Sequence, residues 1–326
     1  MTQTSNFNNH IISFDVGKYE LEVATIPPDR PRSIPNTKAA ILKELKAQQR
    51  RNVRLALPPI LVVCEATGGY ERMLLELAHE LGLEAHRAEG RRVRLFALLT
   101  GQRAKTDPLD AAVIASFAQK SDYLIRYVPP SPVEKKLVAL IARREELLKM
   151  KLAEQSREEH MSDPLIVKSL RTVITMLKKQ LKLLETKIAS LIRSDAELVR
   201  KNNLLQSVIG VGPITAQTLL AKMPELGTLP KGQAAALIGL APFNRDSGQT
   251  NRPRHICAGR FEVRRCLFMA ATVAIAKNPV LKRKFQNLRE RGKPYKVALI
   301  AIMRKMIVIL NAILKSDQPW KGAKIA

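Results

Sequence analysis

The sequence contains few cysteines and few aromatic residues. Three of its 326 residues are cysteines, and none belongs to a Cys-x-x-Cys pair, which excludes a disulfide scaffold and a cysteine-rich zinc site. Aromatic residues make up 4% of the chain, so base stacking is excluded as its main mode of binding nucleic acid. The N-terminus is polar and lacks the apolar region of a secretory signal peptide. We therefore expect a cytosolic protein with reduced thiols.

Acidic residues are scarce relative to basic ones. The chain has 55 Lys and Arg against 29 Asp and Glu, which gives a formal net charge of +26 at pH 7. From Arg245 onward there are nineteen basic residues and four acidic ones, so the last quarter carries most of the excess. This charge indicates a polyanionic partner, most simply nucleic acid. A ribosomal-type basic protein or a membrane-surface protein is the alternative, although the 46% hydrophobic content allows a folded core.

The first 130 residues alternate between strand-like and helix-like patterns. A β-hairpin is predicted over residues 11–25, with its turn at Gly17 and Lys18. Apolar runs predict short strands over 60–66 and 84–88, and helical patterns cover 38–50, 68–82 and the residues from Arg91 onward. Strands that alternate with helices predict an α/β layer.

Long helices are predicted from Pro132 to about Ile192, with a break at residues 162–164. After the break, apolar residues repeat with heptad spacing at Leu170, Ile174, Leu177, Leu181, Leu184, Ile188 and Leu191. This pattern predicts either an intermolecular coiled coil or a helical hairpin that packs within its own chain. The sequence favours neither alternative.

The rest of the chain predicts a mainly helical domain. Residues 207–223, SVIGVGPITAQTLLAKM, place a Gly-Val-Gly-Pro turn between two apolar helical stretches. This is typical of a helix-hairpin-helix, whose backbone N–H groups bind phosphate, although a plain turn between core helices has the same pattern. Residues 258–314 predict basic helices. The apolar run at 297–314 contains Arg304 and Lys305, so we expect a packed amphipathic helix and no membrane span.

Four acidic residues lie at the ends of predicted core elements. Asp15 and Glu65 end apolar strands, and Asp107 and Asp110 begin a helix whose first turn contains Pro108. Asp107 and Asp110 share one helix face because they are three residues apart. Carboxylate oxygens are ligands that Mg²⁺ prefers, and paired Mg²⁺ ions clamp the oxygens of a phosphodiester. The set indicates a metal site, whereas each acid taken singly is explained as a solvent-facing residue or, for Asp107, as a helix cap.

Ser247 lies in a predicted loop that is rich in arginine. Its neighbours in sequence are Arg245, Arg252, Arg254 and Arg260. Arginine forks bind pairs of phosphate oxygens, and a serine hydroxyl activated by a base or a metal can attack a phosphodiester. Ser-Gly is also an ordinary turn dipeptide, so the loop by itself leaves both interpretations open.

Six segments, in this order, resemble the DEDD transposases of the insertion-sequence family one-ten, which are bridge-RNA-guided recombinases. The segments are FDVGK (14–18), VVCEATGGYE (62–71), RAKTDPLDAAVIA (103–115), IGVGPITA (209–216), ALIGLAPFNRDSG (236–248) and ICAGRFEVRRCLFMAA (256–271). The resemblance spans nearly the whole chain and agrees in both the order and the spacing of the segments.

This resemblance implies three domains. Residues 1–130 are expected to form an α/β RNase H-like (RuvC-like) domain, residues 131–195 coiled-coil helices, and residues 196–326 a mainly α transposase domain with a helix-hairpin-helix. The implied cofactor is Mg²⁺, bound by Asp15, Glu65, Asp107 and Asp110. The implied nucleophile is Ser247, which forms a 5′-phosphoserine link to DNA.

The resemblance also implies the partners. These are target and donor DNA, a noncoding guide RNA and further copies of the chain in a tetramer, in which the acids of one subunit meet the serine of another. Expected nucleic-acid contacts are Arg103, Lys105, Gly210, Gly212, Arg245, Arg252, Arg254, Arg260, Arg264 and Arg265. We expect the protein in the bacterial cytoplasm, associated with the nucleoid.

Two other classes of function are compatible with the residues. In a structure-specific nuclease the four acids would activate water, and Ser247 would be a turn residue that forms no protein–DNA adduct. In a basic nucleic-acid scaffold there would be no strand cleavage for the acids to catalyse.

Overall fold

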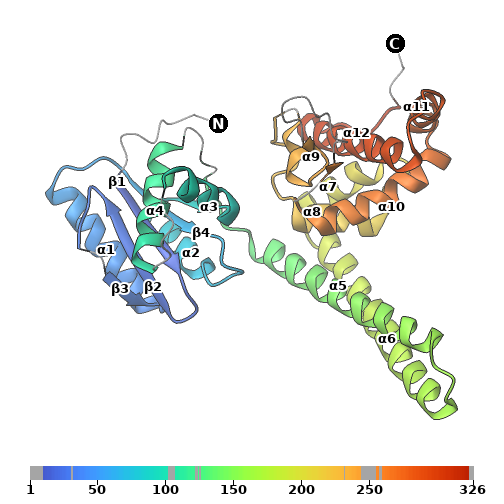
Figure 1. The fold of residues 1–326 in the computed structure, drawn as a ribbon, viewed down its shortest axis with the longest axis horizontal. Helices are drawn as coiled ribbons and strands as arrows, with labels where there is room; N and C mark the ends of the chain where they lie inside the picture. Colours follow the sequence, from blue (N-terminus) through green and yellow to red (C-terminus); the bar gives the residue numbers. More distant parts are fainter. Residues whose placement is uncertain are drawn as a thin grey trace. The chain divides into compact units, whose positions relative to one another are not determined.

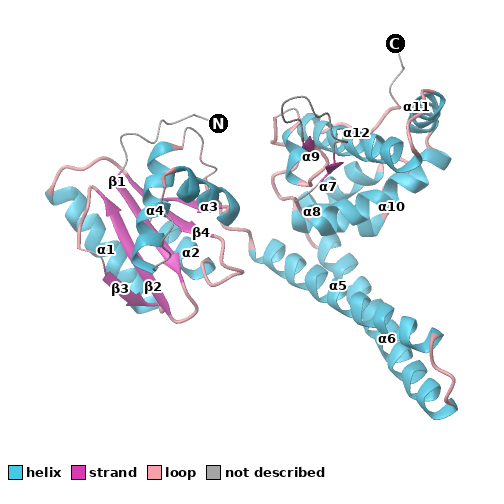
Figure 2. Ribbon diagram, in the orientation of Figure 1, coloured by secondary structure: helices cyan, strands magenta, loops and turns pink. Residues whose placement is uncertain are grey.

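The structure is a computed structural model that describes residues 10–30, 32–101, 107–121, 124, 126–230, 232–243, 255–256 and 259–322. The chain divides into two compact units, residues 1–129 and residues 130–326. Among the described residues, the longer strands all lie in the first unit, and the second is almost entirely helical (Figures 1 and 2).

The first unit is built on a five-stranded sheet. Its strands are β1 (His10–Val16), β2 (Glu20–Ile26), β3 (Arg32–Pro35), β4 (Ile60–Glu65) and β5 (Glu84–Ala88), in the order β3-β2-β1-β4-β5. β1 is antiparallel to β2 and parallel to β4, and β4 is parallel to β5. This mixed topology fits the expected RNase H-like fold.

Helices cover both faces of this sheet. They are α1 (Lys38–Arg54), α2 (Arg72–Glu80), α3 (Gly90–Leu99) and α4 (Asp107–Lys120). Because strand side chains alternate between faces, Ile12 and Phe14 of β1 pack with α1 and α2, whereas Ile11 packs with α3 and α4. The sheet therefore has an apolar layer on each face, between its strands and the helices that cover them (Figure 1). The C-terminal ends of β1 and β4 lie between these two layers.

The second unit begins with a helical hairpin made of α5 (Pro132–Glu159) and α6 (Pro164–Arg193). Asp163 caps α6 by accepting bonds from the N–H groups of Leu165 and Ile166, at the break that the sequence predicted. The buried heptad residues of α6 include Leu177 and Leu181, which pack with Leu147 of α5. The seam therefore packs within its own chain, which is the second of the two predicted alternatives.

The described part of the second unit contains six further helices. They are α7 (Ala196–Gln206), α8 (Pro213–Lys222), α9 (Gln233–Leu237), α10 (Phe261–Lys277), α11 (Pro279–Glu290) and α12 (Tyr295–Ser316). Among the described helices, only α12 is long and apolar enough to cross a membrane, and 56% of its most apolar stretch is buried in the protein. It packs against α7, α9, α10 and α11, as expected of a core helix.

The structure adds three strands that the sequence did not predict. β3 is a four-residue edge strand whose residues alternate between half-buried and exposed, so it has little apolar signal. β6 (Pro242–Phe243) and β7 (His255–Ile256) are two-residue strands that pair antiparallel. Strands this short carry no readable periodicity.

Candidate active site

Asp15 and Glu65 lie at the ends of two neighbouring parallel strands. Phe14 of β1 is in register with Cys64 of β4, so the next pair along the two strands is Asp15 and Glu65. Side chains at every second residue of a strand share one face of the sheet. Ile11 of β1 and Val63 of β4 pack with α3 and α4, so Asp15 and Glu65 belong to that same face. The parallel ladder therefore places the two carboxylates side by side on one face.

Helix α4 brings Asp110 to the same place. The Ser13 hydroxyl, two residues before Asp15 and on the same face, donates a buried hydrogen bond of 2.7 Å to the carbonyl oxygen of Ala111. Asp110 directly precedes Ala111 and is half-buried. This bond fixes the first turns of α4 against β1, so the backbones of three of the four predicted acids lie at one end of the sheet.

The carboxylate of Glu65 lies against the first residue of α3, Gly90. A Cβ atom built on Gly90 would lie 2.1 Å from Oε1 of Glu65, so any larger residue would force the Glu65 carboxylate to shift. The N-terminus of a helix also attracts negative charge. Gly90 thus leaves the space that the Glu65 carboxylate occupies, and sequence reasoning missed it. A glycine two residues after the predicted strand 84–88 was the available signal.

Glu71 organises the loop that follows Glu65. It is 1% exposed, and its Oε2 accepts bonds from the N–H of Gly69 at 2.8 Å and from the hydroxyl of Thr67 at 3.1 Å. Its Oε1 faces Nη1 of Arg87 on β5 at 3.5 Å. Burial raises the pKa of Glu71, but these turn amides and Arg87 outweigh it, so the net pKa lies below the ordinary value. Sequence reasoning also missed this residue.

Carboxylate oxygens are donors that a hard divalent cation prefers, so these acids fit one by their chemistry. In the described part of the chain, however, no three His, Cys, Asp or Glu side chains lie close enough to hold a metal ion. Asp107 is the first residue of α4, but its side chain lies outside the described residues. Three acids from β1, β4 and α4 are thus the described part of the candidate site.

Ser247 lies outside the residues that the structure describes, as do Arg103, Lys105, Arg245, Arg252 and Arg254. The structure does describe the residues on either side of 244–254, which is the segment that contains Ser247 and is called the serine segment below. β6 pairs with β7 there, and a Cβ on Gly259 would lie 2.2 Å from the backbone nitrogen of Gly239. The chain therefore leaves and rejoins the core of the second unit at one place.

The Gly-Val-Gly-Pro turn joins α7 to α8. Gly210 has a positive φ of 109°, and a Cβ on it would lie 2.7 Å from Cβ of Ala274 in α10. Gly212 is the N-cap of α8 and makes no side-chain cap. A Cβ built there would meet nothing within 4 Å. Gly210 is therefore required for packing, while Gly212 lies at an open helix N-terminus of the kind that binds anions.

Three predicted contact arginines lie at or in α10. Arg260 is its N-cap. The Arg260 guanidinium donates a 2.6 Å hydrogen bond to the carbonyl oxygen of Lys222 and forms a 2.6 Å ion pair with Glu225. Arg264 donates to the Ile238 carbonyl oxygen at 3.2 Å. Arg265 is half-buried. In this structure Arg260 thus binds residues at and just beyond the end of α8, and Arg264 binds the residue that follows α9.

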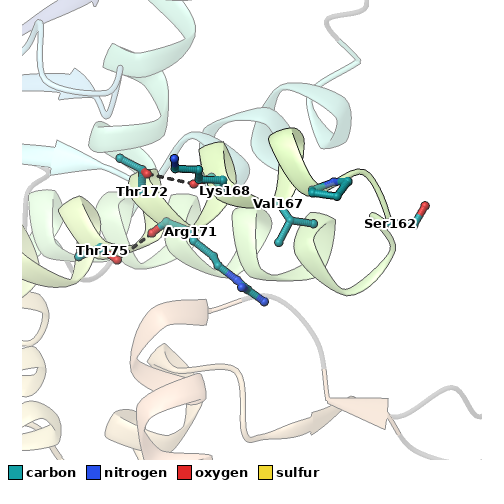
Figure 3. Close-up of a pocket in the computed structure, with 7 residues that line it drawn as sticks. Ser162, Val167, Lys168, Arg171, Thr172 and Thr175 are labelled. Atoms are coloured by element: carbon teal, nitrogen blue, oxygen red, sulfur yellow. Dashed lines mark hydrogen bonds between the residues drawn. The ribbon is translucent and has the colours of Figure 1, made fainter.

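One hollow shares no lining residue with these groups. It has a volume of about 560 Å³ and lies at the tip of α6, lined by Ser162, Pro164, Val167, Lys168, Arg171, Thr172 and Thr175 (Figure 3). The hydroxyls of Thr172 and Thr175 donate to backbone carbonyls of their own helix (Figure 3), and no carboxylate lines it. It offers no acid–base or metal chemistry.

Two family models match the chain. Residues 12–161 match a model of DEDD transposases of the IS110 type, described as "Transposase". Residues 202–286 match the model described as "Transposase IS116/IS110/IS902 family". The first match contains the predicted acids, and the second contains the Gly-Val-Gly-Pro turn and the serine segment.

Curated proteins show the same similarity. The pilin gene-inverting proteins of Moraxella bovis and Moraxella lacunata are each 28% identical over 264 residues, which cover 79% of this chain and 81% of each relative. The probable family 20 transposase of Pseudomonas aeruginosa is 26% identical over 322 residues, which cover 86% of this chain and 91% of that protein.

Proposed function

The chain belongs to the IS116/IS110/IS902 family of transposases, and from that premise we propose that it is a site-specific DNA recombinase with a serine nucleophile and an acidic Mg²⁺ site. The observation that supports the proposal is the β1–β4 register, which places Asp15 beside Glu65, together with the Ser13–Ala111 hydrogen bond, which fixes the start of α4 against β1. Transposases cut and rejoin DNA, and acids at this position suit phosphoryl transfer.

The acids of the first unit hold and orient the cofactor. Asp15, Glu65 and Asp110, together with Asp107, would bind Mg²⁺, which when present supplies Lewis acidity and neutralises charge on the scissile phosphate. Gly90 gives the Glu65 carboxylate its position beside α3. The Glu71-bonded turn keeps the chain after Glu65 in one conformation.

The serine supplies the covalent step. Oγ of Ser247 forms a bond to the phosphorus, the bond from phosphorus to the 3′ oxygen breaks, the hydroxyl proton passes to a base, and the 3′ oxygen takes up a proton. Attack by the 3′ hydroxyl of another strand reverses these changes and frees the serine. Arg245, Arg252 and Arg254 are placed in sequence to bind the phosphate oxygens.

Two further parts of the proposal concern partners. A noncoding guide RNA would pair with the DNA, which suits a chain whose positive charge favours backbone contacts over base readout. The recombinase would act as a tetramer built as a dimer of dimers. Exposed apolar residues Val173, Met176 and Leu183 follow one another at helical spacing on α6, which favours association of hairpins from different subunits.

The experiment that tests the proposal is an adduct assay. The full-length protein, the RNA that copurifies with it and DNA that carries the junction of its element are incubated with Mg²⁺ and separated on a denaturing gel. We expect a covalent protein–DNA adduct that disappears with EDTA and with Ser247→Ala, while Ser247→Ala keeps its affinity for nucleic acid. Adducts that persist in Ser247→Ala would overturn the nucleophile assignment.

The alternative is a RuvC-like endonuclease that hydrolyses DNA junctions. One observation favours it. Asp15, Glu65 and Asp110 all lie in the first unit, so these acids need no serine from the second unit to form a site. Against it, two relatives are named for inverting a pilin gene, and inversion requires rejoining as well as cutting. Cleaved DNA with a free 5′-phosphate and no adduct would establish the nuclease.

A further inference from the structure

Three loops of the first unit are tied together beside the candidate active site. Asn36 donates its side-chain Nδ2 to the carbonyl oxygens of Gly17 at 2.9 Å and Tyr70 at 3.4 Å. Its backbone N–H donates to the carbonyl oxygen of Tyr19 at 2.7 Å. The turn after β1 and the loop after β4 are therefore held side by side, just beyond the strands that end in Asp15 and Glu65.

The side chains that this arrangement presents are two exposed tyrosines. Tyr19 is 74% exposed and Tyr70 is 49% exposed, in a chain with only five tyrosines. The ammonium group of Lys18 lies 4.8 Å from the centre of the Tyr19 ring, which leaves the other face of that ring open. Two exposed rings on adjoining loops offer π faces on which a partner can stack.

Tyr70 also borders a hollow of about 390 Å³. Its lining residues are Lys38, Gly69, Tyr70, Arg72, Met73, Glu76, Leu77 and Glu80. Met73 and Leu77 supply apolar surface, and Lys38 and Arg72 supply positive charge. The volume lies within the range of about 300–1,000 Å³ that is usual for small-ligand pockets.

We propose that Tyr70 and this hollow, together with Tyr19, bind an unpaired nucleotide of a nucleic-acid strand that passes the loops after β1 and β4. The inference rests on the proposed function only in that it takes nucleic acid as the partner. A base of a single strand has a free π face for Tyr70, whereas bases in a duplex are stacked on one another. The cations Lys38 and Arg72 attract the adjoining phosphates.

The two acids in the hollow agree with a base better than with a phosphate. Carboxylates such as Glu80 accept hydrogen bonds from the amino group on the edge of a base, but they repel phosphate oxygens. The arrangement therefore places the base inward, beside Tyr70, and the backbone outward, beside the cations. An apolar peptide as the occupant would leave Lys38 and Arg72 without a role.

The test uses the full-length protein and a short single-stranded oligodeoxycytidine that contains one 5-bromodeoxycytidine, because cytosine carries an amino group on its edge. After irradiation, crosslinked peptides are identified by mass spectrometry, and affinity is measured by fluorescence anisotropy over a series of salt concentrations. We expect crosslinks in the peptides that contain Tyr70 or Tyr19. Tyr70→Ala should lose its crosslink and bind the strand at least about fivefold more weakly, the lower end of a stacking loss.

Two variants separate stacking from charge and from misfolding. Tyr70→Phe keeps the ring and should bind like the unchanged protein. Lys38→Gln should flatten the salt dependence by about 0.7 in the slope of log K against log salt, which Tyr70→Ala should leave unchanged. Asn36 bonds only the backbone of Tyr70, so Tyr70→Ala keeps the loop tie, which equal thermal stability would verify.

Crosslinks confined to other peptides, or equal single-strand affinity of Tyr70→Ala and the unchanged protein, would overturn the inference. Equal losses for a hairpin duplex and for the single strand would also overturn it, because stacking would then not be the cause. The adduct assay with the unchanged protein is independent of these outcomes. Failure of the proposed function and failure of this inference are therefore distinguishable.

Discussion

Gly90 and Glu65 show how a residue without a side chain can determine a carboxylate's position. We expect Gly90→Ala to weaken Mn²⁺ binding by about 10- to 100-fold, the usual cost of disturbing groups that orient metal ligands, because the new Cβ would occupy the place of Oε1. Thermal unfolding of Gly90→Ala verifies that the variant still folds. Titration of Mn²⁺ followed by electron paramagnetic resonance measures the affinity.

A second substitution makes this prediction specific. Glu65→Asp withdraws the carboxylate by one methylene, so Gly90→Ala combined with Glu65→Asp should bind Mn²⁺ more tightly than Gly90→Ala alone. Leu95→Ala, at an exposed position of the same helix, is the control and should bind like the unchanged protein. Unchanged Mn²⁺ affinity in Gly90→Ala would show that Glu65 does not need this space.

Glu71 should make the stability of the first unit depend on pH. Its pKa lies below the ordinary value in the folded protein, so its stabilising effect is complete above the unfolded pKa of about 4.3 and is lost as pH falls through the folded pKa. We expect Glu71→Gln to lower the free energy of unfolding by about 1–3 kcal/mol at neutral pH. Hydrogen exchange of β4 and β5 at several pH values measures this difference, and a difference that grows toward acid pH would contradict the assignment.

The sequence marks the predicted acids more clearly than it marks the groups that contact them. Asp15, Glu65 and Asp110 were recognisable because each ends or begins an element that the apolar pattern predicts. Gly90 contacts a residue 25 positions earlier, and no local pattern reports such a contact. Glu71 follows a Gly-Gly turn and looks like a surface acid until its burial is known.

At the scale of elements, the α5–α6 hairpin has one apolar seam that it buries itself. Ile188 is fully buried in it, so Ile188→Ala should cost about 2–5 kcal/mol through the lost contacts and the cavity that remains. Urea unfolding followed by helical circular dichroism measures the loss. The exposed Leu165→Ala is the matched control, and a similar cost for both variants would contradict the packing described.

The second apolar stripe of α6 leads to a prediction about self-association. Met176 is 55% exposed and lies next to Leu177 of the buried seam. We expect Met176→Glu to weaken oligomer formation, because a charge would be buried between hairpins, while the helix content stays the same. Sedimentation velocity measures the oligomer. Loss of helix content together with the oligomer would instead assign Met176 to the hairpin's own core.

A heptad pattern predicts that a helix has a partner but not which one. The seam residues of α6 would look the same against α5 and against another subunit, so both alternatives stayed open until the contacts were known. Helices with full turns of apolar repeat were predicted well. β3, β6 and β7 were missed because their pairing, and not their composition, makes them strands.

At the scale of the whole molecule, the acids and the serine belong to different units. Asp15 lies in the unit of residues 1–129 and Ser247 in the sequence of the other. If active sites are shared between subunits, a mixture of Asp15→Ala and Ser247→Ala proteins should recover part of the recombination that each has lost. Product formation by mixed oligomers measures this. No recovery in oligomers verified to contain both chains would assign each site to one chain.

Charge was the whole-molecule property that the sequence predicted most directly. A net charge of +26 requires an anionic partner whatever the arrangement of the units. The identity of the DNA site and of any guide RNA is not encoded in protein side chains if base pairing selects the target. For this reason, the protein sequence does not predict the DNA site or the guide RNA.

The pairing of β6 with β7 and the contact of Gly259 with Gly239 have a consequence for design. A segment whose two ends are fixed at one point can lengthen at small entropic cost, about 0.6 kcal/mol for each doubling. A longer chain between residues 243 and 255 is therefore expected to cost little in the free energy of folding. A designer can accordingly graft a longer segment onto the same two ends.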